Sequence, residues 1–111
     1  MAMLPSLMLG VALGPTPLAA QSESLRAAAK LSGLTTGMAQ ACLLDPTPVL
    51  HAFRDLMDRK QMQGAQRSRL VKLVTEASDQ GAATQQQPGA MSCAEVRGQI
   101  RRTTRRLRRA K

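Results

Sequence analysis

Apolar residues recur at spacings of three and four along most of the chain, which is typical of helices that bury one face. The first such stripe lies in residues 22–43 and consists of Leu25, Ala28, Leu31, Leu34, Met38, Ala41 and Cys42. Ser22 is suited to cap the start of this helix, and the pair Asp45-Pro46 is suited to end it. We therefore predict a first helix over residues 22–43.

Two further segments show the same pattern. In residues 48–62 the inward face is expected to consist of Val49, Leu50, Phe53, Leu56 and Met57. Thr47 is a suitable N-cap for this helix, and Asp55 and Arg59 have the spacing of an exposed ion pair. In residues 65–80 the predicted helix has Gly81 as its C-terminal stop, and its inward positions are Leu70, Val71, Val74 and Ala77.

The C-terminal part of the chain begins with a break in the pattern. Residues 82–91 are rich in Gln, Gly and Pro and have no period, so we predict a loop there. Ser92 and Glu95 then have the spacing of a capping box, which marks a helix start. Over residues 92–111 a narrow apolar seam follows a 4-3-4-3 spacing at Val96, Ile100, Thr103, Leu107 and Ala110.

These segments together predict an all-α protein, a small bundle of about four helices. The predicted organisation is a helical domain over residues 21–94, which contains the first three helices, and a C-terminal helix over residues 92–111. At 111 residues the chain has room for one small domain.

The first twenty residues are predicted to be a signal peptide. An uncharged apolar run from Leu4 to Leu13 is too short to span a bilayer, and it is followed by the helix breakers Gly14, Pro15 and Pro17. Cleavage is expected between Ala20 and Gln21, which predicts an exported protein of the bacterial periplasm. The run is preceded by no Lys or Arg, so the alternative is a flexible apolar N-terminus.

The two cysteines fit export. Cys42 and Cys93 fall at the end of the first predicted helix and at the start of the last, so we predict a disulfide between these helix ends. Two buried free thiols are the alternative. Since His51 is the only histidine and there is no CxxC motif, a closed zinc site and other metal centres are not expected.

Charge singles out the C-terminal helix. Residues 1–94 carry eight Lys or Arg against six Asp or Glu (+2), whereas residues 95–111 carry eight against Glu95 alone (+7). On a helix, one flank of the apolar seam would carry Arg97, Arg101, Arg105 and Arg108, and the other Arg102, Arg106 and Arg109. With Lys111, these side chains are the candidate residues for binding an anionic partner.

Three partners fit such a helix: an anionic membrane surface, an acidic protein and a nucleic acid. Phe53 is the only aromatic residue, so base stacking has little support, and export separates the protein from most nucleic acid. We therefore expect an envelope protein that binds a membrane surface or an acidic protein. An intracellular nucleic-acid-binding protein is the alternative, and a basic surface that only keeps the chain soluble is a third reading.

Catalysis is not expected, because the residues form no catalytic constellation and no phosphate-cradling motif. His51 lies off the apolar face of its helix and should be solvated. Asp55 and Asp58 are spaced for acid–base work, but they lie among basic residues, which favours an ordinary mixed-charge surface. We predict no cofactor and no small-molecule substrate.

The order of these features resembles a family of small exported alphaproteobacterial proteins that have two cysteines and no known function. The resemblance covers Ala41 to Ile100: a first Cys, "FRDLM" at 53–57, "RSRLVKLV" at 67–74, a glycine-marked turn and a second Cys before a basic helix. In that family the segment before the second Cys is rich in aromatic residues, whereas residues 78–92 contain none. The resemblance implies export, helices and the disulfide, and it implies no activity.

Overall fold

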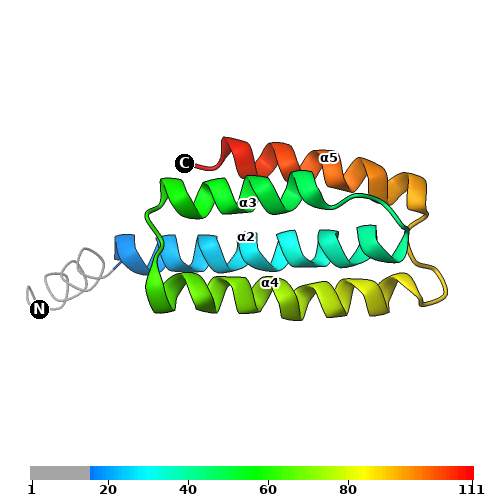
Figure 1. Ribbon diagram of the computed structural model, residues 1–111, viewed down its shortest axis with the longest axis horizontal. Coiled ribbons are helices and arrows are strands. Elements are labelled where there is room, and N and C mark those ends of the chain that lie inside the picture. The colour runs from blue at the N-terminus through cyan, green and yellow to red at the C-terminus, as the bar shows by residue number, and fades with distance from the viewer. Residues whose placement is uncertain (1–15) are drawn as a thin grey trace, which may run out of the picture.

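The computed structural model describes residues 16–111, and these residues form four helices and no strand. The helices are α2 (Thr16–Ala41), α3 (Thr47–Arg59), α4 (Gly64–Gln85) and α5 (Cys93–Arg109) (Figure 1). The predicted all-α fold is confirmed. Most of the expected signal peptide, residues 1–15, lies outside the described residues, and its last five positions belong to α2.

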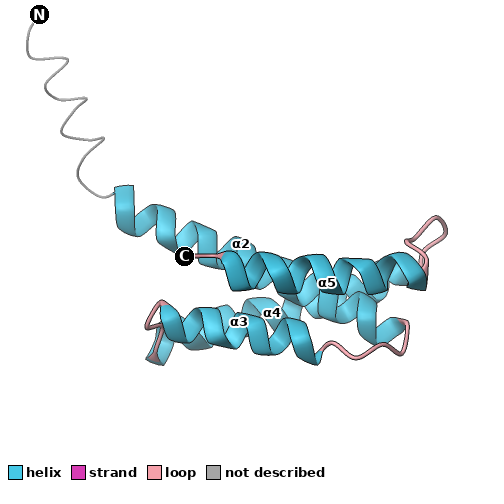
Figure 2. Cartoon of the chain, turned by 90° about the horizontal axis from the view of Figure 1, so that it is seen from above, coloured by secondary structure: helices cyan, strands magenta, loops and turns pink. Residues whose placement is uncertain are grey.

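The helices alternate in direction, so that α2 and α4 run one way and α3 and α5 run the other (Figure 1). The α2–α3 and α4–α5 connections lie at one end of the molecule, and the short α3–α4 turn lies at the other (Figure 2). α2 packs against each of the other three helices, whereas α4 packs mainly on α2. α2 is therefore the central helix of the bundle.

Small residues allow α2 to take this central place. Its buried residues include Ala29, Ser32, Thr35, Thr36 and Ala39. The predicted single stripe is wrong, because Ala28, Leu31, Leu34 and Met38 are only half-buried and Ala41 is exposed. A helix with three neighbours is buried on most sides, and small side chains let those neighbours approach closely.

The helices α2 and α4 pack backbone against backbone at glycine positions. A Cβ atom on Gly37 would overlap the carbonyl oxygen of Ser78, and one on Gly81 would overlap the carbonyl oxygen of Leu34. Gly81 is thus a packing residue inside α4, and the prediction that it ends the helix is wrong. Because this packing continues past Gly81, α4 reaches Gln85 and the loop expected at 82–91 begins at residue 86.

The main apolar core lies between α2, α3 and α5. α3 contributes Val49, Ala52, Phe53, Leu56 and Met57, and α5 contributes Val96, Ile100, Thr103 and Leu107. The predicted seam of α5 therefore faces the core. Two positions that were predicted to face inward do not, since Leu50 is 38% exposed and Val71 is 47% exposed.

The ends of α2 and α3 share one backbone motif. After α2, Leu43 adopts a left-handed conformation (φ 57°), and the N–H of Leu44 donates to the carbonyl of Ala39 at 2.8 Å. After α3, Gln61 adopts the same conformation, and the N–H of Met62 donates to the carbonyl of Met57 at 2.9 Å. Both are Schellman motifs that satisfy the last carbonyl groups of a helix.

The start of α3 differs from the expected cap. The helix begins at Thr47, whose backbone N–H donates to Oδ1 of Asp45 at 2.9 Å. Hydrogen bonding from Thr47 holds the pKa of Asp45 below its ordinary value. The hydroxyl of Thr47 makes the larger contribution, and its backbone N–H makes the smaller one. Asp45 therefore supplies the acceptor at this helix start, and Thr47 is not the N-cap.

Candidate anion-binding surface on α5

The first turn of α5 is held by side-chain hydrogen bonds and by a disulfide. Ser92 Oγ accepts the N–H of Glu95 at 3.1 Å, and Glu95 Oε1 accepts the N–H of Ser92 at 3.0 Å, which completes the predicted capping box. The hydrogen bond from the backbone N–H of Ser92, followed by the interaction with its hydroxyl, holds the pKa of Glu95 below its ordinary value. The predicted disulfide is also present: Cys42 and Cys93 are bonded, with their Cα atoms 5.6 Å apart.

The last turn of α5 is held by α3. Nη2 of Arg59 donates to the carbonyl oxygens of Leu107 at 3.0 Å and of Ala110 at 3.1 Å. Asp55 is 3.5 Å from Nη1 of Arg108 and 3.8 Å from Nε of Arg54, so the predicted Asp55–Arg59 pair is wrong. Arg59 instead satisfies helix-terminal carbonyl groups, a favourable position for a cation.

The middle of α5 is fixed by a buried polar contact. The hydroxyls of Thr103 and Thr35 lie 3.1 Å apart, and Nε2 of Gln99 donates to Thr103 Oγ1 at 3.1 Å. Thr103 is therefore accommodated in an otherwise apolar seam, since its hydroxyl has partners. With its seam on the core, α5 turns its basic residues outward.

All eight predicted anion-binding residues are exposed, namely Arg97, Arg101, Arg102, Arg105, Arg106, Arg108, Arg109 and Lys111. The structure does not bring them together as one site. Four of them line one open groove of about 470 Å³, with Ala110 beside them: Arg102, Arg105, Arg106 and Arg109. We call this hollow the arginine groove. The sequence predicted Arg105 on the opposite flank of the seam from Arg102 and Arg106. In the structure it lines the same groove as these two residues.

No acidic side chain lines the arginine groove, although Glu95 lies near enough to Arg102 for their opposite charges to interact. Within residues 23–111, the ion pairs join Arg54 and Arg108 to Asp55, and Arg67 to Asp58. None of the four groove arginines is in an ion pair, and Arg102 donates to the amide oxygen of Gln99 at 3.1 Å. Like charges on one helix face repel one another, so an anion placed among these guanidinium groups would be favoured.

Two larger grooves have apolar floors. One of about 610 Å³ lies between α2, α3 and α5 and includes Leu25, Leu31 and Leu107 among its lining residues. Another of about 530 Å³ lies between α2 and α4 and is lined by Leu70 and Leu73 together with charges of both signs. Sequence patterns did not predict either groove, because each is built from residues of separate helices.

The other candidate residues are ordinary surface groups. His51 is exposed, as predicted, and Asp58 lies 2.6 Å from Nη1 of Arg67 at the α3–α4 turn. In the described part of the chain, no three His, Cys, Asp or Glu side chains gather where a metal ion could be held. No described helix has the length and hydropathy needed to cross a membrane. Comparison with family models, curated proteins and solved structures finds no match for this chain.

Proposed function

We propose that this is an exported protein of the bacterial cell envelope that binds an anionic membrane surface through the arginine groove. The observation that carries the proposal is the gathering of four exposed arginines on one face of a firmly held helix, none of them in an ion pair with a described residue. The disulfide supports export, because such bonds persist in oxidising compartments such as the periplasm. The protein acts by binding and performs no catalysis.

The attraction is electrostatic. A Lys or Arg near an anionic membrane surface contributes roughly 1 kcal/mol, so four neighbouring arginines are enough for measurable, reversible binding. The apolar seam residues Val96, Ile100 and Leu107 are buried, and α5 therefore has no large apolar side chain to insert into the bilayer. Binding should accordingly weaken as salt is raised, because the screening length falls to roughly 3 Å at 1 M.

A membrane surface fits the groove better than the other anionic partners do. Nucleic-acid surfaces that hold single strands use aromatic rings, and Phe53, the only Phe, Tyr or Trp in this chain, is buried at 3% exposure. An acidic protein would need a matching interface with an apolar centre, and the groove arginines surround only Ala110. Lipid phosphate groups need neither stacking nor a matched apolar surface.

Vesicle binding tests the proposal. The variant with Arg102, Arg105, Arg106 and Arg109 changed to Gln should bind vesicles of equal parts phosphatidylglycerol and phosphatidylcholine at least tenfold more weakly than the parent, measured by co-sedimentation at low salt. Its control loses the same charge elsewhere, with Arg26, Lys30, Arg69 and Lys72, all exposed, changed to Gln. The control should keep most of the binding.

Three outcomes would count against the proposal. Equal loss in both variants would mean that net charge alone acts, without a site. Equal binding to pure phosphatidylcholine vesicles would remove the electrostatic basis. Tighter binding to duplex DNA or single-stranded RNA than to the vesicles, at matched salt, would favour the nucleic-acid alternative. Helical circular dichroism of each variant should match that of the parent, since these side chains do not fill the core.

A further inference from the structure

The arginine groove adjoins a second groove of the bundle. Arg106 and Ala110 line it, and the same two residues also line the 610 Å³ groove between α2, α3 and α5. We call the second hollow the leucine groove, after Leu25, Leu31, Leu56 and Leu107 in its lining. The two grooves are therefore neighbours that meet at the C-terminal turns of α5.

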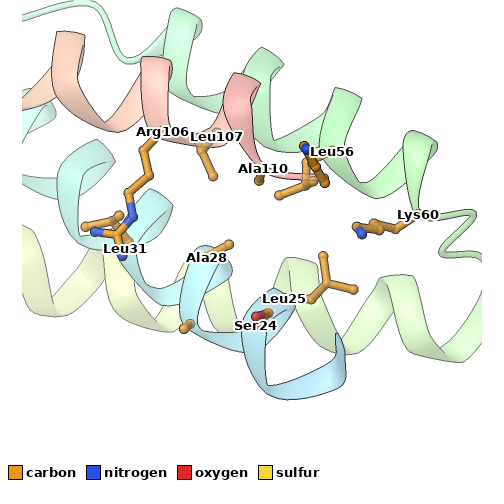
Figure 3. Close-up of a pocket in the computed structure, with 11 residues that line it drawn as sticks. Ser24, Leu25, Ala28, Leu31, Leu56, Lys60, Arg106, Leu107 and Ala110 are labelled. Atoms are coloured by element: carbon orange, nitrogen blue, oxygen red, sulfur yellow. The ribbon is translucent and has the colours of Figure 1, made fainter. Parts of the chain in front are cut away.

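The leucine groove is an apolar channel between three helices (Figure 3). Leu25, Ala28 and Leu31 line it from α2, Leu56 lines it from α3, and Leu107 lines it from α5. Figure 3 shows Arg106 reaching from α5 toward Leu31 at one end of the channel, while Lys60 extends into it from the other end. A ligand in this channel would contact the half-buried Ala28 and Leu31 over a floor formed by buried leucines, and it would meet a cation at each end.

The ionisable side chains that line the two grooves have one sign. Lys60, Arg106 and Lys111 are the ionisable residues that line the leucine groove, and no Asp or Glu lines either groove. The groove between α2 and α4 differs, because Glu76 lies there together with Arg26, Arg69 and Lys72. Of these three grooves in the described part of the chain, only the adjoining pair joins an apolar channel to a cluster of arginines that are in no ion pair.

We propose that the adjoining grooves hold one molecule of an anionic lipid, with its phosphate among the arginines beside Arg106 and an acyl chain in the leucine groove. A phosphate accepts hydrogen bonds from more than one guanidinium group, and Arg106 can contact it from the shared edge. The acyl chain replaces water in the apolar channel, which is favourable for each buried methylene. The flexible stem of Lys60 lets its ammonium group move out to solvent as the chain enters.

Other occupants use only part of this site. Inorganic phosphate would occupy the arginine groove and leave the apolar channel in water, and a neutral amphiphile would leave the guanidinium groups unpaired. Charge complementarity therefore selects a ligand that is both anionic and apolar. The proposal rests on the proposed function, since it names the lipid of the membrane surface as the ligand, and it adds that one lipid chain leaves the bilayer and enters the protein.

Soluble single-chain lipids separate this idea from surface binding. Lysophosphatidic acids with acyl chains of increasing length, kept below their micelle concentrations, should bind the disulfide-bonded protein one to one in calorimetry. Each added methylene should tighten binding roughly fourfold until the channel is full. Lysophosphatidylcholine of equal chain length should bind at least tenfold more weakly, and inorganic phosphate should give no saturable binding in the same range.

A variant that fills the channel provides the second arm. Ala27 lines the leucine groove and is exposed, so Ala27→Trp should occupy the channel without disturbing the core. It should weaken lysophosphatidic acid binding at least tenfold, and it should weaken anionic vesicle binding by less than the change of the four groove arginines does, because those arginines remain. The matched control is Ala83→Trp, because Ala83 is exposed on α4 and lines none of the three grooves. Ala27→Glu, which puts a carboxylate in the channel, should behave as Ala27→Trp does.

The outcomes distinguish the two proposals. If vesicle binding depends on the arginine groove but lysophosphatidic acid affinity does not rise with chain length, the single-lipid site is wrong and the surface proposal stands. If Ala27→Trp and Ala27→Glu both bind the lysolipid as the parent does, the leucine groove is not the binding site. If vesicle binding itself does not depend on the groove arginines, the proposed function fails first.

Discussion

Single small residues determine how closely α2 approaches its neighbours. Gly37 faces the backbone of α4, and Thr35 meets Thr103 of α5 through a buried hydroxyl pair. Thr36 is buried as well, at 4% exposure, and its hydroxyl has no hydrogen-bond partner among the described residues. The close packing of the central helix therefore depends on the small size of its buried side chains. This packing also leaves the Thr36 hydroxyl buried without a hydrogen-bond partner among the described residues.

Replacing glycine by alanine inside a helix should have opposite effects on stability at two positions, Gly37 in α2 and Gly98 in α5. Gly37→Ala should destabilise the protein by about 2 kcal/mol, because its Cβ would overlap the carbonyl oxygen of Ser78 and push α4 away. Gly98→Ala should stabilise it by up to about 1 kcal/mol, since alanine favours the helix and the nearest atom is Nη1 of Arg102, a movable side-chain end at 3.1 Å. Chemical denaturation measures both, and stabilisation by Gly37→Ala would contradict the close α2–α4 packing.

The residues that sequence patterns misread are those whose role depends on a neighbour. Glycine is the residue type that commonly ends a helix, but Gly81 lies inside α4. It is required there because a Cβ atom would overlap the carbonyl oxygen of Leu34 in α2. Leu43 and Gln61 occupy left-handed positions that usually belong to glycine, so neither motif could be predicted from residue type. Leu43 is also 93% exposed, which an apolar residue beside a disulfide does not suggest.

Among the elements, α5 shows most clearly what local sequence can predict. Its start at Ser92 and Glu95 was predicted and is confirmed, because a capping box involves only residues three apart. The contact of Arg59 with its last carbonyl groups was not predicted, because it joins residues 48 and 51 positions apart. Tertiary contacts of this kind leave no signal in the spacing of one helix.

Acidification should loosen the start of α5. The Ser92 hydrogen bonds hold the pKa of Glu95 below its ordinary value of 4.5, so ionised Glu95 stabilises the fold above that pH. This contribution is lost as the pH falls through the lowered pKa of the folded protein. Glu95→Gln should therefore be less stable than the parent at pH 7 and equally stable at low pH, measured by thermal unfolding across a pH series.

The control for this prediction is Glu76→Gln, which removes a carboxylate from the exposed surface of α4. Glu76 takes no part in a helix cap, so Glu76→Gln removes one negative charge without removing a cap. A constant difference between Glu95→Gln and the parent from pH 7 down to strongly acidic solution would mean that the capping carboxylate does not contribute through its charge.

At the scale of the whole molecule, the sequence predicted the helical class, the order of four helices and the disulfide between Cys42 and Cys93. It also predicted that the C-terminal helix would bury one narrow seam and expose its basic residues. It did not predict that four arginines form a groove or that this groove adjoins an apolar channel. Both features depend on how α2, α3 and α5 are placed, which local periodicity does not specify.

The disulfide should dominate the stability of this small fold. It closes a loop of 51 residues, for which the loop-closure model gives about 4 kcal/mol. The double variant Cys42→Ala/Cys93→Ala should lose that amount in the free energy of unfolding, measured by denaturant titration. The unfolded, unreduced parent should show no maleimide-reactive thiol, and reduction should release two. Two reactive thiols before reduction would contradict the bond.

The anchoring of α5 at both ends has a consequence for the energetics of binding. A basic tail that is disordered when free must give up conformational entropy when it meets a partner, roughly 1–2 kcal/mol for the backbone of each residue that becomes fixed. In this protein the disulfide and capping box hold the first turn of α5, and Arg59 holds the last. The backbone of α5 has already lost this conformational entropy during folding. Contact with an anionic surface therefore has to restrict only the arginine side chains.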